Sequence, residues 1–379
     1  MISIVVLIVF ICYAGLVAIL AIGWRLASTK PMEGSVSAAL EGGPLISVLV
    51  AARNEERCLP ILLKDLGAQH YPNYEVIIVD DQSEDNTADV CRRVVADDPR
   101  FRLVSANGEG KKAALTQAVA AAQGLWIVTT DADCRVGPNW LAAMTQMFVN
   151  ETVMLCFGPV GTFGSTRFDC MQSMEFAALI GSGAATAAFG KPTMCNGANL
   201  AYRKAAFVAV NGYSGNEKIP SGDDEFLMRK IYNQFPESVR YCADANALVT
   251  TGTSPTINAF FEQRVRWAGK WRYNTSMTAN LLALGMLLFH LCMLALPVLL
   301  VTGTIKPSVA LLCILIKVVA ELYFLYSLRS LMVLRWSWTA FLILQLVHSC
   351  YVVVVAIWSQ FSDFQWKGRR LKSLMTSGQ

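Results

Sequence analysis

No charged residue occurs between Met1 and Trp24. At about 1.5 Å per helical residue, a helix of that length exceeds a hydrocarbon core of roughly 30 Å. A secretory signal would need a basic leading region and a shorter apolar core, and the sequence has neither. We therefore expect a retained transmembrane helix over residues 1–24. The whole chain is 54% hydrophobic and only 16% charged, whereas soluble domains are about 25% charged.

The apolar residues are concentrated near the two ends of the chain, which predicts membrane segments on either side of a globular domain. A linker at 25–44 precedes a globular domain at 45–253, followed by an interfacial helix at 254–275. A C-terminal membrane region at 276–361 contains about three apolar stretches, and a basic tail occupies 362–379. The apolar stretches run over 277–304, 308–328 and 338–361.

Lys and Arg flank the globular domain on both sides, at Arg25 and Lys30 and again at Arg264 to Arg272. Such residues favour the cytoplasmic face of a membrane. We therefore expect a multi-pass protein of the cell (inner) membrane with a cytosolic globular domain. Four full crossings would place the basic tail outside, against the same rule, so one stretch between Ile305 and Phe361 could be re-entrant or interfacial.

The eleven Cys are scattered without CxxC spacing, and several lie inside apolar runs. We interpret them as small core residues in a reducing compartment. His70, His290 and His348 are far apart in sequence, which disfavours a histidine metal site. A bound metal would be a hard cation held by oxygen atoms.

Short β-branched runs alternate with helical ones through the first half of the globular domain, which predicts a parallel, doubly wound α/β sheet. Ligands bind beyond the carboxyl ends of the strands in such sheets. Asp80, Asp81, Asp131 and Asp133 all follow predicted strands. The expected strands are 45–51, 74–79, 101–104 and 126–129, and the expected helices are 54–69, 86–97 and 111–122.

Two of these strand ends carry paired carboxylates with different expected tasks. Asp131 and Asp133 could hold Mg²⁺ or Mn²⁺ bridging a nucleotide diphosphate, although acidic pairs also cap helices. Asp80 and Asp81 could bind a base or ribose. Their alternative is a turn followed by an N-cap, which residues 85–87 could supply.

A third pair, Asp223 and Asp224, follows Gly222 at the start of a predicted helix. A carboxylate there could take the proton from an acceptor hydroxyl, and one base suffices for an inverting displacement. Acidic residues at a helix N-terminus that complement the dipole are the alternative.

Gln263, Arg266 and Trp267 share one helix face by their spacing. Arg266 could clamp phosphates, and Trp267 could stack against a sugar or order the acceptor. The same segment has the composition of an interfacial helix, and both interpretations can hold together.

Two further features each allow two interpretations. Lys317 and Glu321 are four residues apart in an apolar stretch. They either have a functional role or form an ion pair that only stabilises the structure. The small residues at 181–190 form either part of an acceptor pocket or a plain packed helix.

Taken in order, these residues resemble the D, DxD, D and QxxRW signature of the membrane-bound family 2 inverting glycosyltransferases with a GT-A fold. The resemblance runs from Ala51 to Trp267. It implies that Glu55 and Asp81 contact the nucleotide, with Lys111 close by. It also implies that Asp131 and Asp133 hold the diphosphate and metal. Asp224 matches the catalytic base, and Asp223 stands where the family usually has Glu. Gln263, Arg266 and Trp267 would shape the diphosphate and acceptor end. Asn199 falls in a segment expected near the acceptor, and 366–369 resembles a tail of glycolipid-forming members.

The sequence thus predicts an α/β, GT-A domain with α-helical membrane segments. The expected activity is transfer from a nucleotide sugar, UDP-linked by preference, to a lipid-borne hydroxyl, with no nucleic-acid partner. A processive polysaccharide synthase of the hyaluronan or poly-N-acetylglucosamine type is the alternative enzyme. A non-catalytic membrane scaffold is the alternative outside catalysis.

Overall fold

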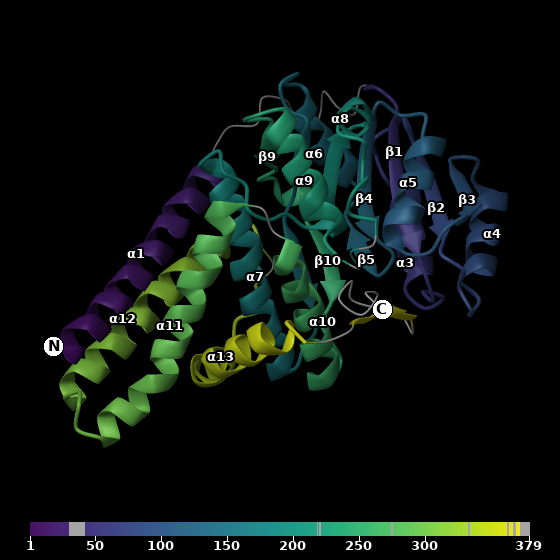
Figure 1. Ribbon diagram of the computed structural model, residues 1–379. Coiled ribbons are helices and arrows are strands. Elements are labelled where there is room, and N and C mark those ends of the chain that lie inside the picture. The colour runs from purple at the N-terminus through teal and green to yellow at the C-terminus, as the bar shows by residue number, and fades with distance from the viewer. Residues whose placement is uncertain are drawn as a thin grey trace.

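The computed structural model describes residues 1–29, 42–217, 219, 221–273, 276–332, 334–361, 364–366 and 369–371. Residues 30–41 of the predicted linker, and most of the predicted basic tail, lie outside this description. A globular α/β domain occupies one side of the molecule and a group of long helices the other (Figure 1).

A seven-stranded sheet forms the centre of the globular domain, in the order β3-β2-β1-β4-β8-β6-β9. Strands β1, β2, β3 and β4 are parallel, as the alternating sequence pattern predicted, whereas β8 runs antiparallel to β4 and β6. The sheet is therefore mixed overall. The strands are β1 (Ile46–Ala52), β2 (Tyr74–Asp80), β3 (Phe101–Ser105), β4 (Trp126–Asp131), β6 (Leu155–Phe157), β8 (Leu200–Arg203) and β9 (Val239–Tyr241).

The register brings the carboxyl ends of the parallel strands together. Ala52 of β1 pairs with Asp80, and Ala51 pairs with Asp131. A second sheet has the strand order β5-β10-β7. Its strands are β5 (Cys134–Val136), β7 (Val160–Phe163) and β10 (Val249–Gly252).

The helices of the globular domain are α3 (Leu59–Gly67), α4 (Thr87–Asp97), α5 (Lys111–Ala121), α6 (Trp140–Thr145), α7 (Arg167–Ala188), α8 (Lys204–Ala209), α9 (Asp223–Gln234) and α10 (Ile257–Gly269). The prediction of a helix from residue 54 was wrong at its start, since α3 begins at Leu59. The backbone N–H groups of Asn54, Glu55 and Glu56 instead donate to side chains of the 83–87 loop. These bonds hold the segment across the strand ends.

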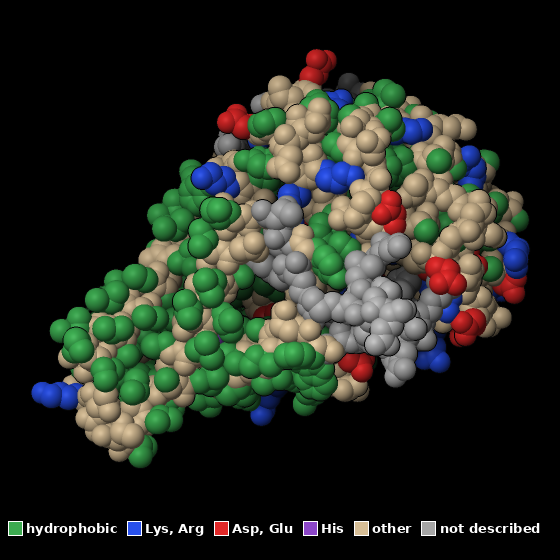
Figure 2. Space-filling model, in the orientation of Figure 1, with side chains coloured by type: hydrophobic (Ala, Val, Ile, Leu, Met, Phe, Trp, Pro, Cys, Tyr) green, Lys and Arg blue, Asp and Glu red, His purple; other side chains and the backbone are tan. Residues whose placement is uncertain are grey.

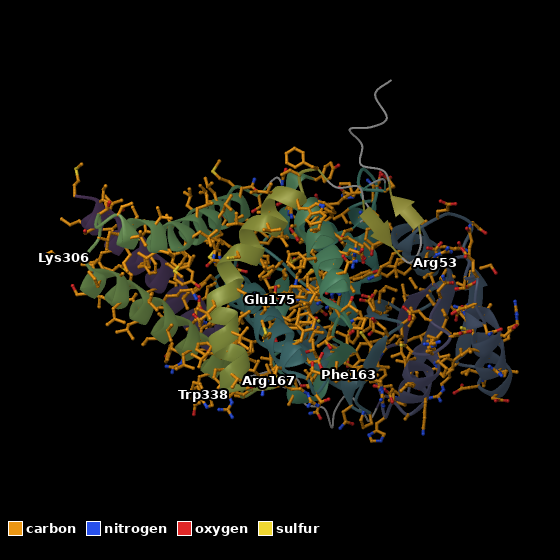
Figure 3. All side chains as sticks on the ribbon, turned by 90° about the horizontal axis from the view of Figure 1, so that it is seen from below. Arg53, Phe163, Arg167, Glu175, Lys306 and Trp338 are labelled. Carbon is orange, nitrogen blue, oxygen red and sulfur yellow. The ribbon has the colours of Figure 1, made fainter. Side chains whose placement is uncertain are left out.

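Four helices are long and apolar enough to cross a membrane: α1 (Ile2–Thr29), α11 (Met277–Val301), α12 (Pro307–Leu328) and α13 (Trp338–Trp358). Hydrophobic side chains cover this part of the surface (Figure 2). Helices α1, α11 and α12 run side by side, whereas α13 runs at a steep angle to them and packs against α11 and α7 (Figures 1 and 3). Lys306, between α11 and α12, lies at the end of the group far from the sheet (Figure 3).

Helix α7 joins the globular domain to the long helices, and small residues let it pack closely. A Cβ on Gly23 of α1 would lie 2.6 Å from Phe189 and 2.8 Å from the Cβ of Ala185. A Cβ on Gly181 would lie 2.5 Å from Leu328 of α12. The run at 181–190 is thus mostly packed helix, and several of its residues also line the cavity described below.

Candidate functional site

A cavity of about 1670 Å³ begins at the carboxyl ends of β1 and β4 and continues between the long helices. Its sheet end is lined by polar residues that include Glu55, Lys111, Asp131, Asp133 and Asp224. Its other end is lined by side chains of α1, α11, α12 and α13, most of them aliphatic. One space therefore joins a cluster of charges to an apolar chamber.

Lys111, the first residue of α5, links two of the predicted carboxylate groups. Its Nζ lies 2.6 Å from Asp131 Oδ1 and 3.2 Å from Asp223 Oδ2. Burial alone would lower the pKa of Lys111, but the two carboxylates raise it well above its usual value. A fixed positive charge therefore stands between the strand-end aspartate and the start of α9.

Asp81 is fully buried in the wall beside the cavity. Its carboxylate accepts a hydrogen bond from the Gly110 N–H, at 3.1 and 3.2 Å from the two oxygens. Gly110 has a φ of +90°, which favours glycine at this turn into α5. Asp80 accepts from the Ser83 N–H at 3.3 Å. Glu55 lines the cavity, while Asp80 and Asp81 shape the loops around it.

Asp223 and Asp224 begin α9, after Gly222 with a φ of +79°. Asp224 accepts hydrogen bonds from the backbone N–H groups of Gly197, at 3.0 Å, and Glu225, at 2.7 Å. Burial alone would raise the pKa of Asp223, but Lys111 holds it below its usual value. Burial raises the pKa of Asp224, although Lys270 opposes that shift. The two neighbours therefore differ: Asp223 is held as an anion, and Asp224 has the greater affinity for a proton.

Helix α10 brings Gln263, Arg266 and Trp267 to the cavity wall. Burial lowers the pKa of Arg266, against the opposing effect of the nearby carboxylates Asp131 and Asp223. Among the described residues, no ion pair or hydrogen bond is recorded for its guanidinium. Arg266 is thus a cation directed at the charged end of the cavity and available to a phosphate.

Sequence reasoning missed the pair that anchors α10. Arg264 Nε donates to Glu175 of α7 at 3.0 and 3.2 Å, and a second guanidinium nitrogen also bonds this carboxylate. The Tyr351 hydroxyl of α13 donates to Glu175 at 2.6 Å. Glu175 lies where α7 passes between the sheet and the long helices (Figure 3). The available signal was that Glu175 is the only charged residue between Asp169 and Lys191.

Asn199 is not brought to the cavity. Its side chain is fully buried, accepts from Trp140 Nε1 at 3.0 Å, and donates to the carbonyls of Pro159 and Ala247 at 2.8 and 2.7 Å. These bonds fix the turn before β8. Its neighbours Asn196, Gly197 and Ala198 line the cavity instead.

Lys317 and Glu321 pair with each other, as one of the two interpretations expected, with Nζ 2.8 Å from Oε2. Glu321 also accepts from Tyr13 of α1 and Gln345 of α13, and it lines the apolar part of the cavity. The charged pair therefore ties three long helices together.

Comparison with known proteins identifies the globular domain. Residues 47–210 match the family described as Glycosyl transferase family 2. The chain contains a family 2 glycosyltransferase domain. The match covers the four parallel strands, the Asp131–Asp133 segment and the Asn196–Asn199 turn, and it ends before Asp223 and the 263–267 segment.

Two curated relatives resemble different shares of the chain. The beta-monoglucosyldiacylglycerol synthase of Trichormus variabilis is 33% identical over 129 residues, which are 33% of this chain and 26% of that protein. The poly-beta-1,6-N-acetyl-D-glucosamine synthase of Staphylococcus aureus is 27% identical over 233 residues, 60% of this chain and 54% of that protein. The chain thus matches only a quarter to about half of these relatives' lengths.

The overall fold resembles a solved glycosyltransferase. The mannosyltransferase PcManGT from Pyrobaculum calidifontis, in complex with GDP-Man and Mn²⁺, aligns with a TM-score of 0.55 and 18% identity, over 94% of this chain and 98% of that one. The expectation of an α/β, GT-A domain with membrane helices is confirmed. That likeness concerns the fold alone.

Proposed function

We propose that this protein is a membrane-integral inverting glycosyltransferase that moves a sugar from a nucleotide donor to the hydroxyl of a lipid. The observation that carries the proposal is the single cavity, charged at the sheet end and aliphatic between the long helices. A water-soluble donor suits the first part and a lipid suits the second.

Asp224 is the proposed general base. It faces the cavity, and its raised pKa gives it a stronger pull on a hydroxyl proton than an ordinary carboxylate has. Asp223 is less suited, because its ion pair with Lys111 stabilises the charged form. The Gly197 and Glu225 N–H groups hold the Asp224 carboxylate in a fixed orientation.

Asp131 and Asp133 are the proposed holders of a divalent cation, Mg²⁺ or Mn²⁺. Both face the cavity one residue apart, and their oxygens suit a hard cation whose other ligands come from the diphosphate and water. Such an ion would offset the charge that develops on the leaving diphosphate. Lys111 and Arg266 add two protein cations on the same side. We place the nucleotide, UDP by preference, near Glu55 and the Asp81–Gly110 turn.

The aliphatic chamber favours a lipid acceptor over a growing polysaccharide. Its walls include Leu16, Leu287 and Leu344, which offer contact to an acyl chain and no hydrogen bonds to a sugar. A processive synthase of the poly-N-acetylglucosamine type remains the second candidate, because a relative that matches 60% of this chain is such a synthase.

We place the globular domain in the cytosol and the long helices in the cell (inner) membrane. Three of these helices run side by side, and α13 runs at a steep angle to them (Figures 1 and 3). With one crossing before the globular domain and two after it, the tail lies on the same side of the membrane as the globular domain. This side agrees with the basic residues of the tail. The steep angle of α13 supports our placing it as the stretch that does not span in the ordinary way.

The test is release of UDP by the purified full chain, supplied with UDP-sugars, Mn²⁺ and either a bacterial lipid extract or no lipid. We expect release that depends on lipid, and that is lost in Asp224→Asn but retained in the control Asp244→Asn, a half-buried cap that does not line the cavity. Equal release with and without lipid, or an Asp224→Asn variant of full activity, would contradict the proposal.

A further inference from the structure

A few polar side chains lie among the aliphatic ones in the apolar half of the cavity, and most of them hydrogen-bond one another. Lys317 and Gln345 both bond Glu321, at 2.8 and 2.7 Å, and the Tyr13 hydroxyl donates to its other oxygen at 2.6 Å. Their role in joining α1, α12 and α13 accounts for them. Two imidazoles in the same region have no such explanation.

His290 of α11 and His348 of α13 lie against each other, with ring centroids 5.0 Å apart and planes at 87°. Both line the cavity. His290 is fully buried, and its Nδ1 lies 3.0 Å from the Ser349 hydroxyl. Its Nε2 has no hydrogen-bond partner among the described residues. His348 is partly exposed, and no hydrogen bond to another described residue is recorded for it.

A polar nitrogen left unpaired in an apolar interior is costly, because it loses water and gains nothing in return. Each neutral imidazole has one N–H donor and one nitrogen acceptor. The pair can therefore bond either a carbonyl or a hydroxyl that enters the chamber. The surrounding aliphatic walls mean that such a group would arrive on an apolar molecule.

The imidazoles are separated from the carboxylates by a succession of side chains. The Tyr351 ring lies 5.3 Å from that of His348, its hydroxyl bonds Glu175, and Glu175 in turn bonds Arg264 of α10. Among the described residues, no contact is recorded between Asp224 and either imidazole, so we take the hydroxyl at Asp224 and the group bound by the imidazoles to be two separate oxygens. The group they bind must lie elsewhere on the same lipid.

We propose that His290 and His348 form a hydrogen-bonding subsite for an oxygen carried within the apolar body of the acceptor lipid. The inference rests on the proposed function, since it takes the chamber to be the lipid site. It narrows the acceptor class to lipids with two oxygen groups: the hydroxyl that receives the sugar, and a hydroxyl or carbonyl well along the apolar part.

The test compares two probes that differ by one hydroxyl, 1-octadecanol and 1,12-octadecanediol. Their affinities for the purified full chain in detergent are measured by competition against radiolabelled 1-octadecanol. One net hydrogen bond predicts about fivefold tighter binding of the diol. The ratio of the diol's affinity to that of 1-octadecanol should fall to about one in the double variant His290→Phe, His348→Phe. It should recover in His348→Gln, which keeps a hydrogen-bonding tip, and persist in the control Met286→Leu, on the same cavity wall.

The outcomes separate this inference from the proposed function. Equal affinity of both alcohols for the wild type, or a diol preference that survives the double variant, would overturn the imidazole subsite and leave the lipid chamber intact. Failure of both alcohols to bind would contradict the chamber itself and both proposals with it. If the double variant does not keep the wild-type melting temperature, the single His348→Phe variant carries the test, because that side chain is partly exposed.

Discussion

Removal of the Glu175 carboxylate is predicted to destabilise the protein severely, because it leaves the Arg264 guanidinium buried without a counter-ion. Both side chains are only 6% exposed, so solvent does not screen the pair. Breaking a buried ion pair by removing one partner costs about 3–5 kcal/mol. The Tyr351 hydroxyl also loses its hydrogen-bond acceptor. The rings of Phe260 and Trp267 offset part of the cost, because their centroids lie 4.5 and 4.4 Å from the guanidinium carbon of Arg264. We expect about 3 kcal/mol or more for Glu175→Leu.

The assay is reversible denaturation of the purified protein in mixed micelles, followed by tryptophan fluorescence. The double variant Glu175→Leu, Arg264→Met should lose less stability than Glu175→Leu alone, since it leaves no unpaired charge. Asp89→Leu is the matched control. It removes the carboxylate of the Arg92–Asp89 ion pair, whose side chains are 66% and 64% exposed, and such pairs contribute about 0–1 kcal/mol. A cost below about 1 kcal/mol for Glu175→Leu would refute the assignment of this pair as the anchor of α10.

Four further predictions follow from the site and its supports. Asp224→Asn should reduce kcat by about 10²–10⁴-fold while UDP affinity, measured by calorimetry, stays at the wild-type value. Because the pKa of Asp224 is raised, kcat should fall on acidification at a pH above the usual carboxylate value of about 4; an acid limb at or below that value would contradict the base assignment. Asp133→Ala should weaken UDP binding in Mn²⁺ but not in EDTA, and equal loss in both would remove Asp133 from the metal site. Gly23→Ala should cost about 1–3 kcal/mol in the same denaturation assay, because its Cβ would meet Ala185 and Phe189, whereas Gly15→Ala, with open space around it, should cost nothing measurable.

Much of the globular fold could be predicted from the sequence, because its signals are local. The runs at Ile46–Ala52 and Tyr74–Asp80 are β-branched and buried, and they form neighbouring parallel strands. Carboxylates that follow such strands come together once the sheet forms, which is how Asp131 reaches the cavity. The start of α3 was mispredicted, since side chains from a loop some 30 residues further along the chain hold residues 54–56 out of the helix.

The parts that the sequence could not give depend on contacts between distant segments. Glu175 and Arg264 are 89 residues apart, and nothing in the local pattern of α10 shows that Arg264 faces α7 while Arg266 faces the cavity. The interior position of Asn199 is likewise set by Trp140, Pro159 and Ala247 in three dimensions. The steep angle of α13 to the other long helices depends on its packing against α7, α10 and α11, which apolar composition does not encode.

The central claim is that one cavity brings a nucleotide sugar to a lipid hydroxyl, and mass spectrometry of the products tests it most directly. Membranes containing the protein are supplied with a panel of nucleotide sugars and Mg²⁺ or Mn²⁺, and lipids and polymers are extracted together. The account predicts a lipid that gains the mass of a single sugar, absent from membranes with Asp224→Asn. A ladder of sugar masses on a polymer, with no singly glycosylated lipid, would contradict it.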